Sequence, residues 1–124
     1  MELVHIIESV LSIYYQTFAQ KNWEMVDTFL SDDFTYFSDK CFSTDKSGYL
    51  QTMSQSDWTI HSCNISNLSI IPSSSSDIVV AVYSIEFKGM SNSVDAQFSA
   101  LETCVFRHND GNWKLAHCHA SNSH

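Results

Sequence analysis

The chain has 124 residues, of which 44% are hydrophobic and 16% charged, a composition that excludes a disordered chain. Fourteen acidic against six basic side chains give a formal net charge of −8, which opposes binding to nucleic-acid phosphates or to an anionic membrane surface. The length suits a single domain, residues 1–124, and we expect neither nucleic acid nor a membrane as a partner.

The N-terminal segment lacks the features of a secretion signal. It has no basic region, and Glu2 and Glu8 interrupt its apolar residues. No apolar run approaches the roughly 20 residues that a membrane-spanning helix needs. We therefore expect a cytoplasmic protein whose four cysteines are free thiols.

The first third of the chain has the apolar spacing of helices. Apolar residues recur at helical intervals over residues 3–18, which predicts an amphipathic helix. Asn22 can cap a second helix, and the polar run 31–33 is expected to end it. A short aromatic strand over residues 34–37 then precedes a third helix, capped at Asp45.

From residue 58 onward the apolar period changes from 3.6 to 2, which is typical of strands. The predicted strands cover about 58–71, 78–88, 94–107 and 113–120. Short turns separate them, so consecutive strands should pair antiparallel, and the Asp110-Gly111 pair favours a tight hairpin. This order predicts an α+β fold, with three N-terminal helices packed on a strongly curved, mainly antiparallel sheet.

The closing segment has a family resemblance. Its motifs are Glu-Thr at 102–103, Asp-Gly-Asn-Trp at 110–113 and His-Cys-His-Ala-Ser at 117–121. They resemble the closing hairpin of the calcium/calmodulin-dependent kinase II association domain and its SnoaL-like relatives. The order of elements resembles the wider nuclear transport factor 2-like superfamily, with its cone-shaped, cystatin-like fold.

The resemblance implies a homodimer or a larger ring, with a pocket at the wide end of the cone. In the kinase association domain, arginines from three strands point into that pocket and suit a carboxylate ligand. The matching positions here are Ile85, Cys104 and Ala120. Without an arginine in the pocket, the buried carboxylate of a ligand would lack a strong partner. The chain is therefore expected to bind a neutral ligand.

Two histidines near the end of the chain are a candidate metal site. His117 and His119 stand two apart on a predicted strand, so both project from one face, whereas Cys118 points the other way. Two ligands alone rarely form a protein zinc site, and we expect no metal. The alternative, which the family supports, is a dimer interface on the outer sheet face formed by Trp113, Leu115, His117 and His119.

Acid–base chemistry in the cone is a second candidate. Ketosteroid isomerase shares the implied fold and uses a first-helix tyrosine, a base carboxylate after the second helix and a protonated carboxyl on the sheet. The corresponding candidates here are Tyr14, Asp39 and Glu102, although the base position itself falls on Ser38. Strand parity groups Glu102 with Cys104 on the pocket side. This pattern predicts a small isomerase, cyclase or hydratase.

A binding pocket without chemistry is the leading hypothesis. Mostly apolar and aromatic walls with a few polar groups are typical of small-molecule sites. The expected lining residues are Phe18, Tyr36, Trp58, Tyr83, Ile85, Phe87, Cys104, Phe106 and Cys118. The same side chains could instead fill the cone, which would leave a ligand-free oligomerisation module. We expect a homodimer that binds a small, neutral, apolar molecule without a cofactor, with the enzyme and the oligomerisation module as alternatives.

Overall fold

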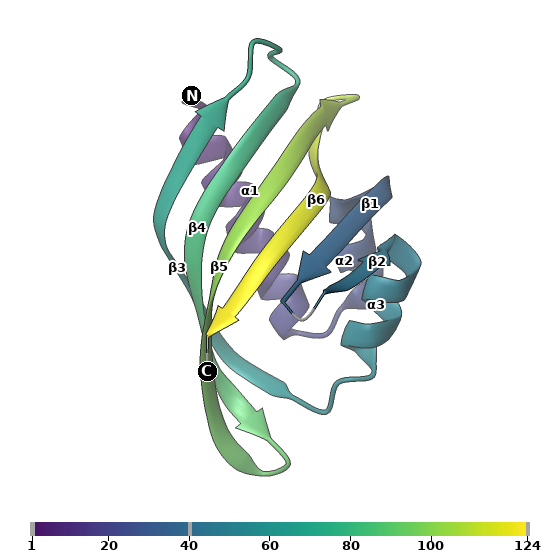
Figure 1. Ribbon diagram of the computed structural model, residues 1–124, viewed down its shortest axis with the longest axis vertical. Helices are drawn as coiled ribbons and strands as arrows, with labels where there is room; N and C mark the ends of the chain where they lie inside the picture. Colours follow the sequence, from purple (N-terminus) through teal and green to yellow (C-terminus); the bar gives the residue numbers. More distant parts are fainter. Residues whose placement is uncertain (1, 40, 124) are drawn as a thin grey trace.

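The computed structural model describes residues 2–39 and 41–123. Within these ranges the chain forms three helices and six strands (Figure 1). In chain order they are α1 (Leu3–Ala19), α2 (Trp23–Phe29), β1 (Leu30–Ser38), β2 (Phe42–Asp45), α3 (Lys46–Ser54), β3 (Thr59–Pro72), β4 (Ile78–Ser91), β5 (Val94–Asn109) and β6 (Asn112–Ser123). None of the described helices combines the length and apolar character that a bilayer crossing requires.

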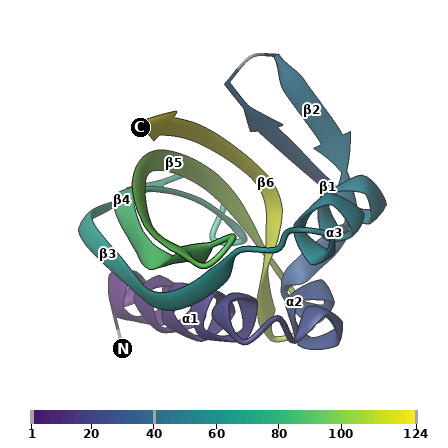
Figure 2. The same ribbon diagram turned by 90° about the horizontal axis from the view of Figure 1, so that it is seen from below.

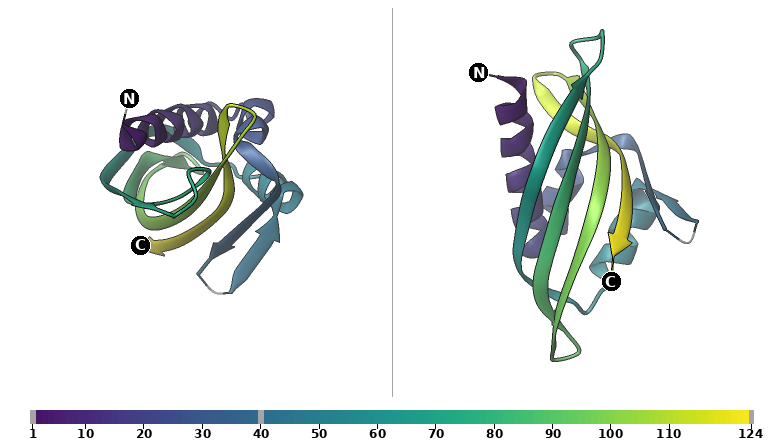
Figure 3. Two further views of the ribbon diagram at one scale, coloured as in Figure 1. Left: turned by 90° about the horizontal axis from the view of Figure 1, so that it is seen from above. Right: turned by 60° about the vertical axis from the view of Figure 1, so that its left-hand side comes forward.

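The strands form one mixed sheet in the order β2-β1-β6-β5-β4-β3. The meander from β3 to β6 is antiparallel, whereas β1 pairs with β6 in parallel. The sheet curls strongly without closing, and α1 lies along its concave side (Figures 2 and 3). These features confirm the predicted α+β fold with three helices on a curved, mainly antiparallel sheet.

Helix starts and the closing turn follow the local sequence rules. The Asn22 side chain accepts a hydrogen bond from the Met25 amide, and Asp45 accepts one from the Gly48 amide, which confirms both predicted caps. Asp110 and Gly111 have φ values of 53° and 81°, the positive values that a tight hairpin turn of this kind requires.

The second helix ends just before the polar run 31–33, close to where it was predicted to end, but the run itself belongs to a strand. It is the beginning of β1, which extends directly from the last turn of α2. The buried side chains of Leu30 and Phe34 hold this strand to the core, while Asp33 stays exposed and pairs with Arg107 Nη1 at 3.0 Å. The short edge strand β2 was also not predicted, because it is polar and largely exposed.

The strand β6 has a β-bulge that changes which side chains face the core. Val105 pairs with His117 and Phe106 pairs with Leu115, so Ala116 is an extra residue opposite the β5 ladder. Leu115 is therefore only 2% exposed and packs in the core. Its predicted place on the outer face is wrong, because the bulge interrupts the regular alternation of the strand.

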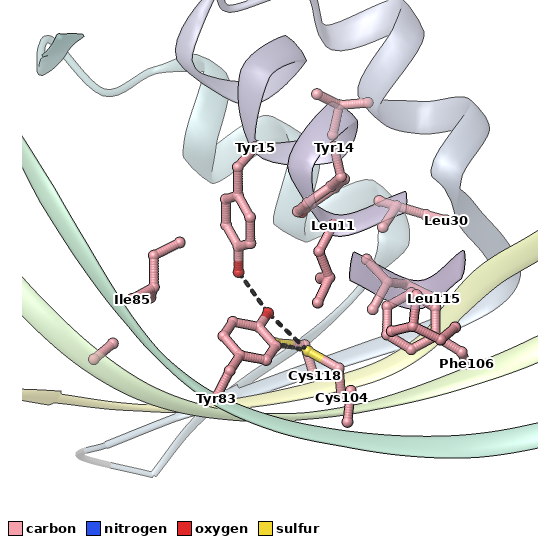
Figure 4. Packing of buried hydrophobic residues seen from close by; sticks show 14 of the residues in the cluster. Leu11, Tyr14, Tyr15, Leu30, Tyr83, Ile85, Cys104, Phe106, Leu115 and Cys118 are labelled. Carbon is pink, nitrogen blue, oxygen red and sulfur yellow. Dashed lines mark hydrogen bonds between the residues drawn. The ribbon is translucent and has the colours of Figure 1, made fainter. Parts of the chain in front are cut away.

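The core lies between α1 and the concave face of the sheet (Figure 4). Figure 4 shows Leu11, Tyr14 and Tyr15 of α1 lying over the concave face, opposite Tyr83 of β4. Apolar burial of this kind is the main favourable contribution to folding, at roughly 25 cal/mol for each Å² removed from water.

Candidate functional site

A cavity of about 330 Å³ lies between the helices and the concave face of the sheet. Residues from all three helices and from five of the strands line it. Eight aromatic side chains form most of its wall: Tyr15, Phe18, Trp23, Tyr36, Tyr49, Trp58, Phe87 and Phe98. A larger hollow between α1 and β3 has Ser, Asn, Gln and His side chains in its wall and is more polar than the aromatic cavity, which is therefore the better candidate for a small apolar ligand.

Four of the predicted pocket residues line this cavity, namely Phe18, Tyr36, Trp58 and Phe87. The other five face the same concave side but pack in the core instead: Tyr83, Ile85, Cys104, Phe106 and Cys118. Figure 4 shows Leu11, Tyr14 and Tyr15 of α1 on the same side of the sheet as Tyr83, Cys104 and Cys118, all of which are buried. The cavity therefore lies to one side of the tightly packed core.

Glu102 is a buried carboxyl on β5 that lines the cavity. Its Oε1 accepts hydrogen bonds from the Tyr15 hydroxyl at 2.9 Å and from the Cys118 thiol at 3.0 Å. The Tyr83 hydroxyl lies 3.4 Å from the same oxygen and 2.7 Å from the Tyr15 hydroxyl. The Cys104 thiol in turn donates to Cys118 over 3.1 Å.

The number of protons gives this network a direction, because each hydroxyl and each thiol has one proton to donate. Since Tyr15 donates to Glu102, Tyr83 must be the donor in the 2.7 Å contact between the two hydroxyls, and its one proton is shared between Tyr15 and, at 3.4 Å, Glu102 Oε1. Cys104 donates to Cys118, which donates to Glu102. Two chains of donors thus end on Oε1, and within the described residues every hydrogen bond to the Glu102 carboxyl uses that oxygen.

Burial raises the pKa of Glu102 above its usual range, and the hydrogen bonds from Cys118, Tyr15 and Tyr83 oppose this shift. Burial also raises the pKa of Tyr15 and of Tyr83, and the negative charge of Glu102 adds to both shifts. Both phenols therefore stay protonated at neutral pH and remain donors. A carboxyl with a raised pKa at a cavity wall can both give and take a proton.

The structure separates the three residues that were predicted as a catalytic set. The Tyr14 hydroxyl bonds the Tyr49 hydroxyl at 2.7 Å, and Tyr14 is buried in the core away from the cavity lining. The half-buried Asp39 accepts hydrogen bonds from the backbone and side-chain nitrogens of Asn122, at 3.4 and 3.1 Å, and does not line the cavity. Of the three, only Glu102 does.

Tyr15 is a cavity-lining residue that was not predicted from the sequence. It lies next to Tyr14 on α1 but contacts Glu102 and lines the cavity. The available signal was the spacing Ile7, Leu11, Tyr15, in which each residue follows the last by four positions and so faces the same side of the helix.

Trp58 presents an unused donor at the same cavity. Its ring packs against Phe98, with ring centroids 3.9 Å apart, and against Phe87 at 5.6 Å. Among the described residues, Trp58 Nε1 is the buried side-chain polar atom that has no hydrogen-bond partner. Leaving such a donor unpaired costs about 1–3 kcal/mol, so a water molecule or a ligand acceptor at this atom is favoured.

The predicted histidine pair lies on the outer side of the sheet. His117 Nδ1 is 2.7 Å from the Thr35 hydroxyl, and burial lowers the pKa of His117 with a further contribution from His119. His119 is exposed, and its ring centroid is 6.4 Å from that of Phe37. Among the described residues, neither histidine belongs to a group of three ligands close enough to hold a metal ion.

Comparison with known proteins identifies the family of this fold and site. Residues 7–123 match the sequence profile of the SnoaL-like domain. The chain belongs to this family. No curated protein sequence matches this SnoaL-like domain.

Solved structures resemble the SnoaL-like domain over nearly its whole length. An NTF2-like protein from Cytophaga hutchinsonii has a TM-score of 0.87 at 19% identity, covering 99% of this chain and 100% of its own. A ketosteroid isomerase-like protein from Erwinia carotovora atroseptica has a TM-score of 0.81 at 15% identity, covering 99% and 98%. The association domain of C. elegans CaMKII has a TM-score of 0.80 at 15% identity, covering 94% and 93%. At these identities the likeness establishes the NTF2-like fold of the SnoaL-like domain, and function has to be argued from the site.

Proposed function

We propose that this SnoaL-like domain is a homodimer that binds a small, neutral, largely apolar molecule in its aromatic cavity. The observation that supports the proposal is the combination of aromatic walls with one buried, hydrogen-bonded carboxyl, Glu102. The cavity volume of about 330 Å³ falls at the small end of the range for ligand sites. Apolar walls provide the affinity, and the few polar groups orient the molecule.

The charges at the cavity favour a neutral ligand. Glu102 and Lys21 are the charged side chains that line the cavity, and Lys21 donates to the Ser56 carbonyl at 3.5 Å near the surface. An anionic ligand would approach the buried carboxyl without an arginine to neutralise it. A hydroxyl or carbonyl group is the better partner, because it can bond the carboxyl without adding a charge.

The free oxygen of Glu102 is the atom that we expect to meet the ligand. Oε1 already accepts from Tyr15 and Cys118, whereas Oε2 takes part in none of these bonds. A ligand hydroxyl can therefore pair with Oε2, while Trp58 Nε1 can donate to a second ligand oxygen. The ligand is expected to have polar atoms at one or both of these points and an apolar body between them.

Binding of 2-naphthol and naphthalene tests this function. The two probes share their apolar body, and only 2-naphthol has a hydroxyl for Glu102. A hydrogen bond to a charged or strongly polarised group is worth about 1.5–3 kcal/mol, so 2-naphthol is expected to bind at least tenfold more tightly. Quenching of Trp23 and Trp58 fluorescence, checked by calorimetry, gives both dissociation constants.

The matched control changes the apolar wall of the cavity rather than the carboxyl. Met53 lines the cavity from α3, and Met53→Ala is expected to weaken both probes equally. Equal affinity of the wild-type protein for the two probes would contradict the role of Glu102. A folded dimer that binds neither probe would instead favour the ligand-free oligomerisation module.

A proton-transfer enzyme is the second candidate function. The observation that favours it is the raised pKa of a carboxyl at the wall of a cavity, with Tyr15 donating to that carboxyl. Glu102 would then be the acid or base, and Tyr15 would take the place expected for Tyr14. A ¹³C NMR titration of the Glu102 carboxyl tests this candidate, and a pKa in the ordinary range for glutamate would rule it out.

The outer sheet face is where we place the dimer interface. Leu101 on β5 and Phe37 on β1 are 63% and 46% exposed, which is high for large apolar side chains. His119 lies opposite Phe37 on one side and Thr103 on the other in the strand ladders. Burying this mixed surface against a second copy would remove the exposed apolar area from water.

Placing a charge in this face is expected to weaken the dimer. His119→Asp introduces a carboxylate that would be desolvated in the interface, and we expect at least a tenfold rise in the dimer dissociation constant. Sedimentation velocity over a range of concentrations measures that constant. His5→Asp makes the same substitution at an exposed position on α1 and should leave it unchanged. An equal response of the two variants would count against the interface.

A further inference from the structure

We propose that Cys104 and Cys118 are a modification site at which a small peroxide oxidises two thiols to a cross-strand disulfide. This inference goes beyond ligand binding, because neither cysteine lines the cavity. Both side chains are buried, at 1% and 7% exposure, and they belong to paired strands of the closing hairpin. Their register and separation suit a disulfide, and a carboxyl lies beside them.

The register of the hairpin suits a disulfide. Cys104 of β5 is directly opposite Cys118 of β6, so both side chains project to the same side of the sheet. Directly opposed residues have Cα atoms about 4.5–5.5 Å apart, within the range of about 4.4–6.8 Å that disulfides span. The two Sγ atoms are 3.1 Å apart, and bond formation brings them to about 2.05 Å.

The other two cysteines lack this arrangement. Cys41 is exposed, and Cys63 is half-buried on β3, where burial raises its pKa to about 11. Within the described residues, Cys104 and Cys118 form a compact group with Glu102, whose ligand atoms all lie within 4.8 Å of one another. The fold therefore pairs two specific thiols and places one carboxyl next to them.

Glu102 provides the base that the first step needs. Its Oε1 lies 3.0 Å from Cys118 Sγ, and Glu102 lines the cavity through which a water-sized, neutral molecule such as hydrogen peroxide can approach. Cys118 transfers its proton to the carboxylate, and the sulfur attacks a peroxide oxygen. The O–O bond breaks, and the departing hydroxide takes the proton from Glu102 to form water.

The second step closes the disulfide. Cys104 Sγ attacks the sulfur of the Cys118 sulfenic acid, the S–O bond breaks, and the departing hydroxide takes the Cys104 proton to form a second water. Two thiols are oxidised by two electrons, and one peroxide is reduced to two waters. The hydrogen bond with Cys104 and burial raise the pKa of the Cys118 thiol, so the first step is slow.

Oxidation also alters the carboxyl at the cavity. Glu102 loses the S–H donor of Cys118 and keeps the donors Tyr15 and Tyr83. Fewer donors to the carboxylate weaken its stabilisation relative to the neutral acid. The disulfide form is therefore expected to bind 2-naphthol with a different affinity from the reduced form.

The experiment uses the full chain with Cys41→Ser and Cys63→Ser, so that only the proposed pair remains. After treatment with hydrogen peroxide, the intact mass is expected to fall by two hydrogens. The denatured protein should then contain no free thiol until dithiothreitol restores two. Adding Cys104→Ser to this background should abolish the loss of two hydrogens. Stepwise addition of oxygen atoms to the folded protein, without loss of two hydrogens, would overturn the proposal.

A second measurement shows whether the folded geometry favours the bond. In glutathione buffers, the folded protein is expected to form the disulfide with an equilibrium constant at least tenfold higher than the urea-unfolded chain. An equal or lower constant in the folded state would overturn the proposal. Binding of Co²⁺ to the reduced protein would also overturn it, because the two cysteines would then form a cation site. Such binding would appear as a sulfur-to-cobalt charge-transfer band that the Cys104→Ser variant lacks. Neither result depends on ligand binding in the cavity.

Discussion

Phe106→Ala is expected to lower the free energy of unfolding by about 3–5 kcal/mol. Phe106 is fully buried on β5 and belongs to the same hydrophobic core cluster as Leu11 of α1, Val26 of α2 and Leu115 of β6. Removing the ring eliminates its apolar contacts and leaves a cavity that the surrounding strands can only partly fill. Urea unfolding followed by circular dichroism measures the change, with the slope of the transition as a check on two-state behaviour.

Phe42→Ala is the matched control for this prediction. It makes the same substitution on the edge strand β2, where Phe42 is 40% exposed. We expect a loss of about 1 kcal/mol or less. A loss of comparable size in both variants would show that Phe106 is not at the centre of the packed core.

Glu102→Gln is expected to make the free energy of unfolding less sensitive to rising pH. Burial raises the pKa of Glu102 in the folded state, whereas the unfolded carboxyl titrates near about 4.3. The folded state then binds the proton more tightly than the unfolded state, so this contribution to stability is fully present below the unfolded pKa. It is lost as pH rises through the folded pKa. Glutamine has no proton to lose and keeps the Oε1 acceptor for Tyr15 and Cys118.

Urea unfolding of both proteins from pH 4 to pH 8 measures this effect. The wild-type free energy of unfolding should fall relative to that of Glu102→Gln, by about 1.4 kcal/mol for each tenfold difference in proton affinity between the folded and unfolded states. Glu8→Gln, on the exposed side of α1, should follow the wild-type curve. If the stability of wild type rose with pH relative to the glutamine variant, the assigned direction of the Glu102 shift would be wrong.

The fold could be predicted from the sequence because apolar residues recur at regular intervals along its long strands and helices. The four predicted strands from residue 58 onward correspond to β3, β4, β5 and β6, with ends that differ by a few residues. The edge strand β2 and the start of β1 were missed because their residues are polar, and only pairing with neighbouring strands makes them extended.

The candidate site was harder to predict from the sequence, because it depends on the direction in which single side chains point. Successive helix residues differ in direction by about 100°, so Tyr14 and Tyr15 point to different surroundings. Tyr14 bonds Tyr49, and Tyr15 bonds Glu102. The apolar stripe on α1 is broad enough to include both tyrosines, and its period alone does not distinguish them.

The bulge on β6 is the other source of error. Sequence alternation grouped Leu115 with His117 and His119, but the extra residue at Ala116 reverses the direction of Leu115. Such an insertion has no clear pattern in a run where both faces of the strand are partly apolar. Glu102 was easier to place, because β5 keeps its alternation from Ala100 to Cys104 and no bulge intervenes.

The parallel pairing of β1 with β6 has a consequence for how the chain is made. Thr35 and His117 meet across this pairing although they are 82 positions apart. During synthesis, β1 and β2 leave the ribosome long before β6 has been made. Until then the Phe34 side chain, which is buried in the folded protein, lacks the neighbouring strand β6. The apolar side of β1 therefore stays exposed until the closing hairpin supplies β6. Folding should therefore be slow for a chain of this length, and a chaperone that shields α1 and β1 would act in this interval.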